Sequence, residues 1–361
     1  MKNGLLLLAA LFVALFPSLA QNAVSGIVVD AETKLPLQGA SVFAQNTTLG
    51  AVTNAEGSFK LSLGKGGYEI VISFTGYVSQ RMNVEAAENK SLQVELKKED
   101  KSLSEVVITS SNEVADGWEK YGSFFIDHFV GATAVGDSCI LQNPEALKFY
   151  YFKRSDKLRV LATEPLRLSN NTLGYTMQYA LDSFVHYYKS GINSYRGSCF
   201  YTQMEGSEEQ QQGWKEARKA VYAGSRLHFL RSYYDSTLKG EGFTVDMLSS
   251  SDKNKFNRLV NPYDSSYYFL DESTGDVELW FGAKVSITYN KQKPEKEYLE
   301  QMKLPLDVPA QISYVSLTDA IILKPNGYFI DQRSWINQGY WSWKNLADQL
   351  PYDYEPEGSG K

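Results

Sequence analysis

The chain has 361 residues, a net charge of −6 and no block of basic residues. This length predicts two or three domains, and the acidic balance excludes nucleic acid as an expected partner. The sequence holds three histidines and two cysteines, no HExxH or HxxE pattern, and neither a phosphate-binding loop nor a dinucleotide fingerprint. We therefore expect no metal site and no cofactor.

Residues 1–20 have the composition of a secretory signal peptide. A basic residue, Lys2, precedes an apolar run from Leu5 to Phe16, and Ser18-Leu19-Ala20 supplies a cleavage site that leaves Gln21 first. The run is shorter than the ~20 residues of a transmembrane helix, and no cysteine follows it to accept a lipid. These features predict an exported protein of the periplasm, or one associated peripherally with the outer membrane, without a transmembrane span.

Residues 21–98 are predicted to form a small β-sandwich. Short strand-like runs alternate with glycine-containing turns from Val24 to Leu96, and Asn54-Ala55-Glu56-Gly57 is expected to be a tight hairpin connection. Positions expected to face inward are apolar: Val28, Val42, Phe59, Leu61, Ile70 and Ile72. About seven short strands in one segment of this length favour two sheets packed face to face.

This segment resembles the carboxypeptidase-regulatory-like domain family. The motifs that carry the resemblance are Gly26-x-Val28-x-Asp30, Pro36-Leu37-x-Gly39-Ala40-x-Val42, Thr53-x-x-x-Gly57-x-Phe59 and Ser73-x-x-Gly76-Tyr77. The resemblance implies an immunoglobulin- or transthyretin-like sandwich with no catalysis of its own. It also implies similarity to the domain that precedes TonB-dependent outer-membrane transporters in Bacteroidetes.

Residues 99–117 are predicted to be a linker around one apolar run. In the transporters that the sandwich resembles, a Glu-Val-Val-Val-Thr-Gly run stands in this place, and here it is Glu105-Val106-Val107-Ile108-Thr109-Ser110. A barrel of about 22 strands with ~10 residues each, plus a plug, would not fit in the residues that follow. We expect an ordinary linker strand, and a contact with TonB is the alternative.

Residues 118–355 are predicted to form a larger mixed α+β domain, and residues 356–361 a disordered tail. A helix is expected from Trp118, and strands over 157–162, 166–168 and 176–188. Alternation from Val277 to Tyr289 predicts one half-buried strand, with hairpin turns at 272–276 and 324–327. Phrases such as Leu173-Gly174-Tyr175 and Leu350-Pro351-x-Asp353-Tyr354 resemble an uncharacterised group of Bacteroidetes envelope proteins, which implies no chemistry.

The clearest helix is predicted over Trp214–Arg231. Its register makes neighbours of one set of residues, which form the candidate binding or structural cluster: Arg218, Tyr222, Ser225, His228 and Arg231. Arg218 lies on a core-facing stripe, so it should meet a carboxylate or a row of carbonyls. His228 could be a base or a ligand, but a hydrogen-bonded core histidine is the favoured alternative.

Other chemistry stays open. Ser225, His228 and Asp127 could form a hydrolase triad, although no G-x-S-x-G elbow is present and Ser225 is expected in the middle of a helix. Paired carboxylates for glycoside cleavage are a further alternative. Cys139 and Cys199 are either a disulfide or two free buried thiols. The 24 tyrosines could provide platforms for sugars or a protein partner, or simply fill strands.

These observations predict a non-catalytic binding or assembly role in the cell envelope. The sandwich is expected to dock to an envelope partner by its face or an edge strand, and the ligand is expected to be an envelope protein or a glycan. The alternative is a hydrolase that acts on glycan or peptide. It requires Arg218 and His228 in a solvent-reaching pocket with carboxylates aimed inward, whereas sealed side chains paired with backbone carbonyls favour a structural role.

Overall fold

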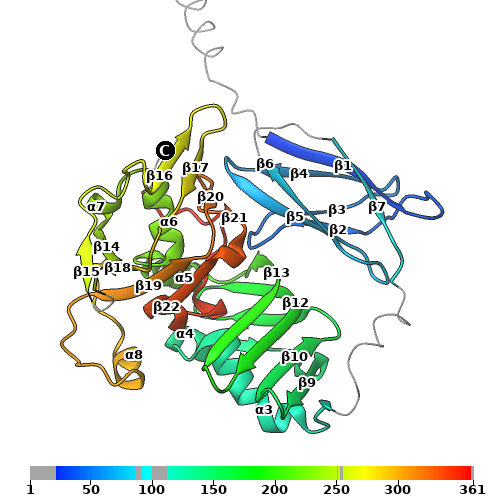
Figure 1. Ribbon diagram of the computed structural model, residues 1–361. Coiled ribbons are helices and arrows are strands. Elements are labelled where there is room, and N and C mark those ends of the chain that lie inside the picture. The colour runs from blue at the N-terminus through cyan, green and yellow to red at the C-terminus, as the bar shows by residue number, and fades with distance from the viewer. Residues whose placement is uncertain (1–21, 86–90, 100–111, 250, 253–254, 359–361) are drawn as a thin grey trace, which may run out of the picture.

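A computed structural model describes residues 22–85, 91–99, 112–249, 251–252 and 255–358. The chain is mainly β: a small sandwich is followed by a larger mixed α+β region with several sheets, and three clusters of buried residues form its hydrophobic cores (Figure 1). The predicted signal peptide and the run from Glu105 to Ser110 lie outside the described residues. Among the described residues, no helix is long and apolar enough to cross a membrane.

The sandwich has the seven strands that the sequence predicts. One sheet has the order β4 (Ser58–Leu63), β1 (Asn22–Asp30), β7 (Ser91–Leu96), and the other β3 (Gly50–Val52), β2 (Ser41–Ala44), β5 (Gly67–Ser73), β6 (Gln80–Glu85). All six positions expected to face inward are buried between the sheets. The predicted hairpin at residues 54–57 is wrong, because β3 and β4 belong to different sheets and the turn carries the chain across the sandwich.

A six-stranded sheet follows, with the order β8-β11-β12-β10-β9 and β13 paired to β12. Its elements are α3 (Gly117–Ile126), η3 (Asp127–Gly131), α4 (Ala134–Asp137), β8 (Cys139–Leu141), η4 (Pro144–Ala146), β9 (Leu147–Phe152), β10 (Lys157–Ala162), β11 (Leu166–Asn170), β12 (Tyr175–Tyr187) and β13 (Ile192–Gln203). One face of this sheet packs against α3 and η3, where Phe125 and Phe129 are fully buried. The other face lacks such a helical layer among the described residues.

The last part has a five-stranded sheet, β15-β14-β18-β19-β22, and a four-stranded sheet, β16-β17-β20-β21. The strands are β14 (Phe243–Leu248), β15 (Phe256–Arg258), β16 (Tyr268–Asp271), β17 (Asp276–Leu279), β18 (Val285–Tyr289), β19 (Gln311–Leu317), β20 (Ile321–Leu323), β21 (Phe329–Ile330) and β22 (Trp335–Gly339). The helices are α5 (Glu208–Tyr222), α6 (Arg226–Tyr234), α7 (Leu238–Glu241), α8 (Lys296–Gln301), η5 (Gln332–Ser334), α9 (Tyr340–Trp343) and η6 (Leu346–Asp348).

Both hairpins predicted in this part are confirmed, because β16 pairs with β17 and β20 with β21. The single strand predicted over Val277–Tyr289 is wrong. Residues 280–284 separate β17 from β18, and the two strands lie in different sheets. The apolar residues of both strands alternate and lie in the same core, so the period of two continues across the break and conceals it.

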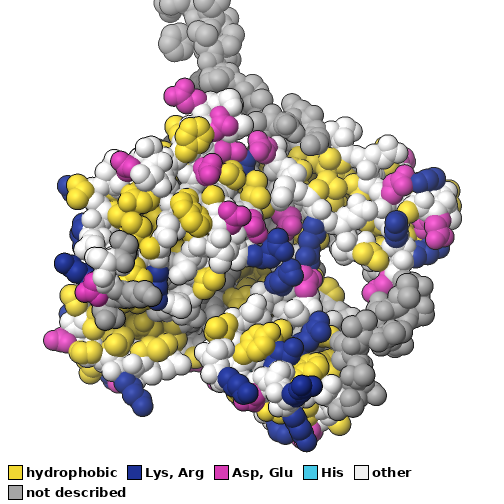
Figure 2. Space-filling view, viewed as in Figure 1, with side chains coloured by type: hydrophobic (Ala, Val, Ile, Leu, Met, Phe, Trp, Pro, Cys, Tyr) yellow, Lys and Arg dark blue, Asp and Glu magenta, His cyan; other side chains and the backbone are white. Residues whose placement is uncertain are grey.

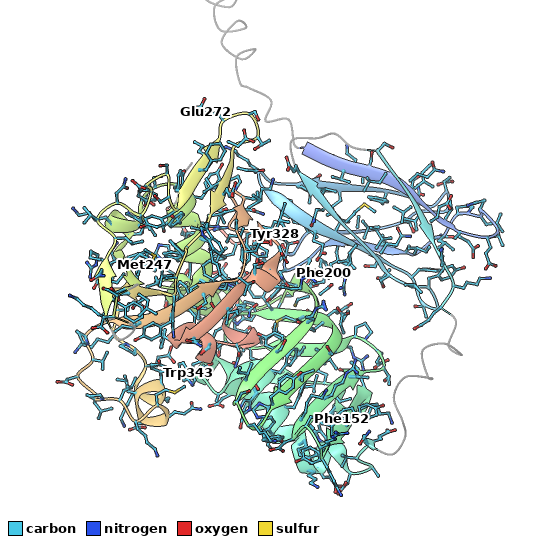
Figure 3. All side chains as sticks on the ribbon, viewed as in Figure 1. Phe152, Phe200, Met247, Glu272, Tyr328 and Trp343 are labelled. Carbon is cyan, nitrogen blue, oxygen red and sulfur yellow. The ribbon has the colours of Figure 1, made fainter. Side chains whose placement is uncertain are left out.

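The sandwich packs against the rest of the chain at its β2–β3 turn. The backbone N–H of Asn46 donates to the Cys199 carbonyl at 2.7 Å, and the carbonyl of Thr47 accepts from Tyr201 at 3.0 Å, so the turn extends the sheet beyond β13. Phe43 lies against Phe200 with ring centroids 5.3 Å apart. Figure 3 labels Phe200 at this junction.

Strands β5 and β6 make the second set of contacts. The guanidinium of Arg81 pairs with both oxygens of Asp182 at 2.9 Å, and the Tyr328 hydroxyl hydrogen-bonds Asn83 at 2.9 Å (Figure 3). The buried amine of Lys324 donates to Glu85 on β6 at 2.5 Å and to Asp276 at 2.7 Å. The sandwich is therefore held by polar contacts on two sides of one interface.

Candidate functional site

The predicted continuous helix over Trp214–Arg231 is wrong, because the chain breaks between α5 and α6. Gly224 at the break has a φ of 77°, and a Cβ there would lie 2.5 Å from the Tyr289 ring and 2.6 Å from the Gln311 side-chain oxygen. The Ser225 hydroxyl accepts from the backbone N–H of His228 at 3.1 Å and so caps α6. Ser225 thus begins a helix instead of lying within one.

Arg218 is bound to backbone carbonyls. Its Nε donates to Leu173 at 2.7 Å and a terminal nitrogen donates to Gly174 at 3.0 Å, and the side chain is only 8% exposed. The guanidinium carbon lies 3.9 Å from the centroid of the Tyr175 ring, a favourable cation–π contact. Burial raises the pKa of Tyr175 to about 12, so this phenol is neutral. Of the two partners expected for Arg218, the structure has the row of carbonyls.

Arg231 is bound in the same way. Its three guanidinium nitrogens donate to the carbonyls of Asn326 at 3.1 Å, Tyr354 at 2.7 Å and Tyr352 at 2.9 Å. The Glu355 carboxylate lies farther away at 3.5 Å. Arg231 therefore ties α6 to the turn between β20 and β21 and to the last described segment of the chain.

His228 is a hydrogen-bonded core residue. Its Nδ1 accepts from the backbone N–H of Gly224 at 3.1 Å, which places the proton on Nε2, 3.2 Å from the Glu241 carboxylate. Burial lowers the pKa of His228 more than Glu241 raises it. The Tyr222 ring lies 4.8 Å from His228 and 5.6 Å from Tyr354, centroid to centroid, so Tyr222 joins the histidine to the C-terminal segment.

A pocket of about 460 Å³ opens beside α5, where three parts of the chain meet. The sandwich contributes Thr48, the six-stranded sheet contributes Tyr175 and Gln203, and Pro351 stands at the start of the C-terminal wall. The charged side chains in its lining are Lys215, Glu216, Arg218, Lys219, Asp353, Glu355 and Glu357. The lining therefore offers both signs of charge together with two tyrosines, Tyr175 and Tyr354.

The sequence did not indicate that Asp353 and Glu357, in the C-terminal wall of this pocket, contact the sandwich and α5. Asp353 accepts from the backbone N–H of Thr48 at 2.9 Å and also from its hydroxyl, across 305 positions of sequence. Glu357, placed in the predicted disordered tail, accepts from Lys215 at 3.0 Å, while residues 359–361 lie outside the described part. The Pro351-x-Asp353-Tyr354 phrase was the only signal for this segment.

The structure does not assemble the hydrolase triad. The carboxylate beside His228 belongs to Glu241, and the Ser225 hydroxyl is used as a helix cap. Asp127 is exposed on η3, and its neighbour His128 hydrogen-bonds the Phe124 carbonyl at 2.8 Å. His228 is also not among the residues that line the pocket.

Cys139 and Cys199 are free and buried, the second of the two alternatives left by the sequence. They lie on β8 and β13, which β11 and β12 separate in the sheet. Burial raises the pKa of the Cys139 thiol to about 12 and that of Cys199 still further, so both are protonated near neutral pH. No group of three or more His, Cys, Asp and Glu side chains arranged to hold a metal occurs in the described ranges.

Comparison with known proteins identifies the family of the sandwich domain. The model of the CarboxypepD_reg-like domain matches residues 24–108. Residues 24–108 are a CarboxypepD_reg-like domain. The chain is 39% identical over 113 residues to the TonB-dependent receptor SusC of Bacteroides thetaiotaomicron, and 32% identical over 94 residues to the TonB-dependent receptor P39 of Formosa agariphila.

These likenesses are partial. They cover 31% and 26% of this chain, but only 11% and 9% of the two receptors. Among solved structures, a cohesin–X-dockerin complex from Acetivibrio cellulolyticus matches 20% of this chain and 52% of its own at 28% identity and a TM-score of 0.18. A Bacteroides fragilis protein of unknown function matches 88% of this chain and 92% of its own at 10% identity and a TM-score of 0.17.

Proposed function

We propose that this chain is an exported cell-envelope protein with a non-catalytic binding role, associated with the periplasm or the outer membrane. The proposal is supported by the resemblance of its first domain to the N-terminal region of outer-membrane receptors. It is supported further by the use of Arg218, Ser225, His228 and Arg231 in helix capping and in bonds to backbone carbonyls and Glu241. Groups engaged in this way hold the fold together and are poorly placed to act on a substrate.

The binding site in this proposal is the pocket beside α5. The exposed amines of Lys215 and Lys219 and the carboxylate of Glu355 face one small volume, over the buried Tyr175 ring. A pocket with both signs of charge suits a ligand that also carries both, such as a peptide segment of an envelope protein or an amino-sugar glycan. Docking of the sandwich completes the pocket, because Thr48 is part of its wall.

One sheet of the sandwich is turned away from the contacts that its described residues make with the rest of the chain, and it offers a surface for a second partner. Its contacts with the rest of the chain use the β2–β3 turn and strands β5 and β6, whereas the sheet β4-β1-β7 lies on the other side of the sandwich core. Docking to an envelope protein by this face, or by the edge strand β7, is therefore compatible with the internal interface.

The test is a binding titration of the mature chain against fractionated envelope peptides and glycans. Lys219→Glu reverses one charge in the pocket, and Lys239→Glu makes the same change at an exposed site on α7. We expect Lys219→Glu to weaken binding about tenfold or more, and Lys239→Glu to leave it unchanged. Equal affinities of the two variants would contradict the assignment of the pocket.

A further inference from the structure

A second surface of the molecule combines aromatic and basic side chains. It is the face of the six-stranded sheet that turns away from α3, at strands β9, β10, β12 and β13. We call it the basic sheet face, and its positions are Lys148, Tyr150, Phe152, Lys157, Arg159, Leu161, Ser183, Val185, Tyr187, Ile192, Ser194 and Arg196. The pocket beside α5 shares none of these residues.

Cross-strand register places these side chains together. Phe152 lies opposite Lys157, Lys157 opposite Tyr187, and Tyr187 opposite Ile192, so the four form one row across the sheet. Tyr187 is 43% exposed and Ile192 59% exposed. The Lys157 amine lies 4.7 Å from the centroid of the Phe152 ring and 5.8 Å from that of Tyr187, between the two rings.

The charge of this face is mainly basic. Four of its positions are basic, Lys148, Lys157, Arg159 and Arg196, although the whole chain has a net charge of −6. Two carboxylates border them: Glu113 lies 3.5 Å from Lys148 at one edge, and Asp182, at the β-bulge beside Ser183, pairs with Arg81 of the sandwich. Figure 2 shows Lys and Arg side chains interspersed with hydrophobic ones over the lobe that carries this sheet.

The face continues into a hollow of about 740 Å³ at the β9–β10 turn. Phe152 lines both the face and the hollow, and Lys153 and Arg154 add two further cations. Figure 3 labels Phe152 at this end of the molecule. Rings and cations thus follow one path from β13 across the sheet to the hollow.

We propose that the basic sheet face binds an anionic polysaccharide. The apolar faces of pyranose rings would lie on Tyr187 and Phe152, and the carboxylate or sulfate groups would pair with Lys157, Arg159 and Arg196. A neutral glycan would use the rings but leave the cations without partners. A polyanion without sugar rings would use the cations but not the rings. The inference concerns a second site and is independent of the pocket proposed above.

The test is affinity electrophoresis of the mature chain in native gels that contain polygalacturonate, dextran, polyaspartate or oligothymidylate. We expect polygalacturonate to retard the protein at concentrations about tenfold lower than any of the other three polymers. Tyr187→Ala and Lys157→Gln should each weaken this retardation about tenfold. Lys296→Gln, which removes an exposed cation from α8, should have no effect.

Four outcomes would overturn the proposal. If polyaspartate retarded the protein as strongly as polygalacturonate, binding would be by charge alone. If dextran did so, the cations would contribute nothing to binding. If oligothymidylate retarded the protein more strongly than polygalacturonate, the ligand would be a nucleic acid. Unchanged retardation in Tyr187→Ala and Lys157→Gln would place the binding elsewhere. Because Tyr187 is at the surface, thermal unfolding of both variants should match that of the parent, which keeps the comparison valid.

Discussion

At the scale of the residue, Arg218 shows how this chain uses buried charge. A guanidinium enclosed among carbonyls satisfies several acceptors at once, and the Tyr175 ring covers one of its faces. The register of the predicted helix was enough to place Arg218 on a core-facing stripe. It could not identify the partners, because Leu173 and Gly174 lie about 45 positions away in sequence and bind through their backbones.

Truncation of Arg218 should therefore destabilise the fold. We expect Arg218→Ala to lower the free energy of unfolding by about 2–4 kcal/mol, because two buried carbonyls lose their donors. Arg218→Lys should lose less, since one bond can be kept. Chemical denaturation measures both variants. If Arg218→Ala were as stable as the parent, the carbonyl clamp would not be structural.

Burial of His228 gives a pH dependence with a definite sign. Its folded-state pKa is lowered, so the neutral form is favoured by folding, and the stability it contributes is present above the unfolded pKa and lost as pH falls. We expect the free energy of unfolding to decrease from pH 7 to pH 5, with a slope of at most about 1.4 kcal/mol per pH unit from one proton.

His228→Gln should flatten that slope. Glutamine can accept from the Gly224 N–H and donate to Glu241 without titrating, so the variant keeps the geometry and loses the proton. Urea denaturation of the two proteins across this pH range is the measurement. Parallel curves would mean that another group causes the dependence.

At the scale of the element, the break between α5 and α6 is the feature that local pattern concealed. Apolar residues continue at helical spacing through Gly224, and a glycine inside a helical pattern is tolerated. What decides the break is the tertiary environment, namely the close approach of Tyr289 and Gln311 together with the positive φ. The same holds for β17 and β18, which share one alternation but belong to two sheets.

Gly224 at the break and Gly213 within α5 offer a matched test. Gly224→Ala should destabilise the protein by more than about 2 kcal/mol, because both the backbone angle and the space are unfavourable. Gly213 lies within α5, and a Cβ there meets nothing within 4 Å. Gly213→Ala should therefore stabilise by about 0.5–1 kcal/mol. Thermal unfolding of both variants checks the contrast, and equal effects would contradict it.

The sandwich illustrates what sequence predicts well. Alternation and turn residues within about 75 positions indicated seven strands, because each strand pairs with a neighbour nearby in sequence or shares one local core. The pocket illustrates the opposite case. Its walls come from Thr48, α5 and residues 351–357, and no local pattern reports contacts between segments so far apart.

At the scale of the whole molecule, two sets of ion pairs hold the sandwich, one around the buried Lys324 amine and one between the part-exposed side chains of Arg81 and Asp182. Burial alone would lower the pKa of Lys324, but its bonds to Asp276 and Glu85 outweigh burial and the pKa is raised. Lys324 is charged and joins the sandwich to the four-stranded sheet. Arg81 and Asp182 form the second ion pair between the sandwich and the rest of the chain.

Loss of the Lys324–Glu85 and Arg81–Asp182 ion pairs should release the sandwich from the rest of the chain. We expect the double variant Glu85→Gln, Asp182→Asn to increase the radius of gyration and to expose the β2–β3 turn to proteolysis. The reason is that Glu85→Gln removes one partner of the buried Lys324 amine, which costs about 2–5 kcal/mol. Asp182→Asn adds the smaller loss of an exposed ion pair, about 0–1 kcal/mol. Glu95→Gln removes an exposed carboxylate that pairs with Lys34 inside the sandwich and should change neither. An unchanged X-ray scattering curve for the double variant would show that the backbone hydrogen bonds of Asn46 and Thr47 are enough to hold the sandwich in place.

The most direct test of the central claim, that the buried cluster supports the fold while the pocket binds, is a turnover assay. The mature chain is incubated with envelope glycans and peptides, and products are followed by mass spectrometry for the parent and for His228→Gln. The account predicts no product that depends on His228, with unchanged ligand binding in the variant. Turnover by the parent that His228→Gln abolishes, with its fold intact, would contradict it.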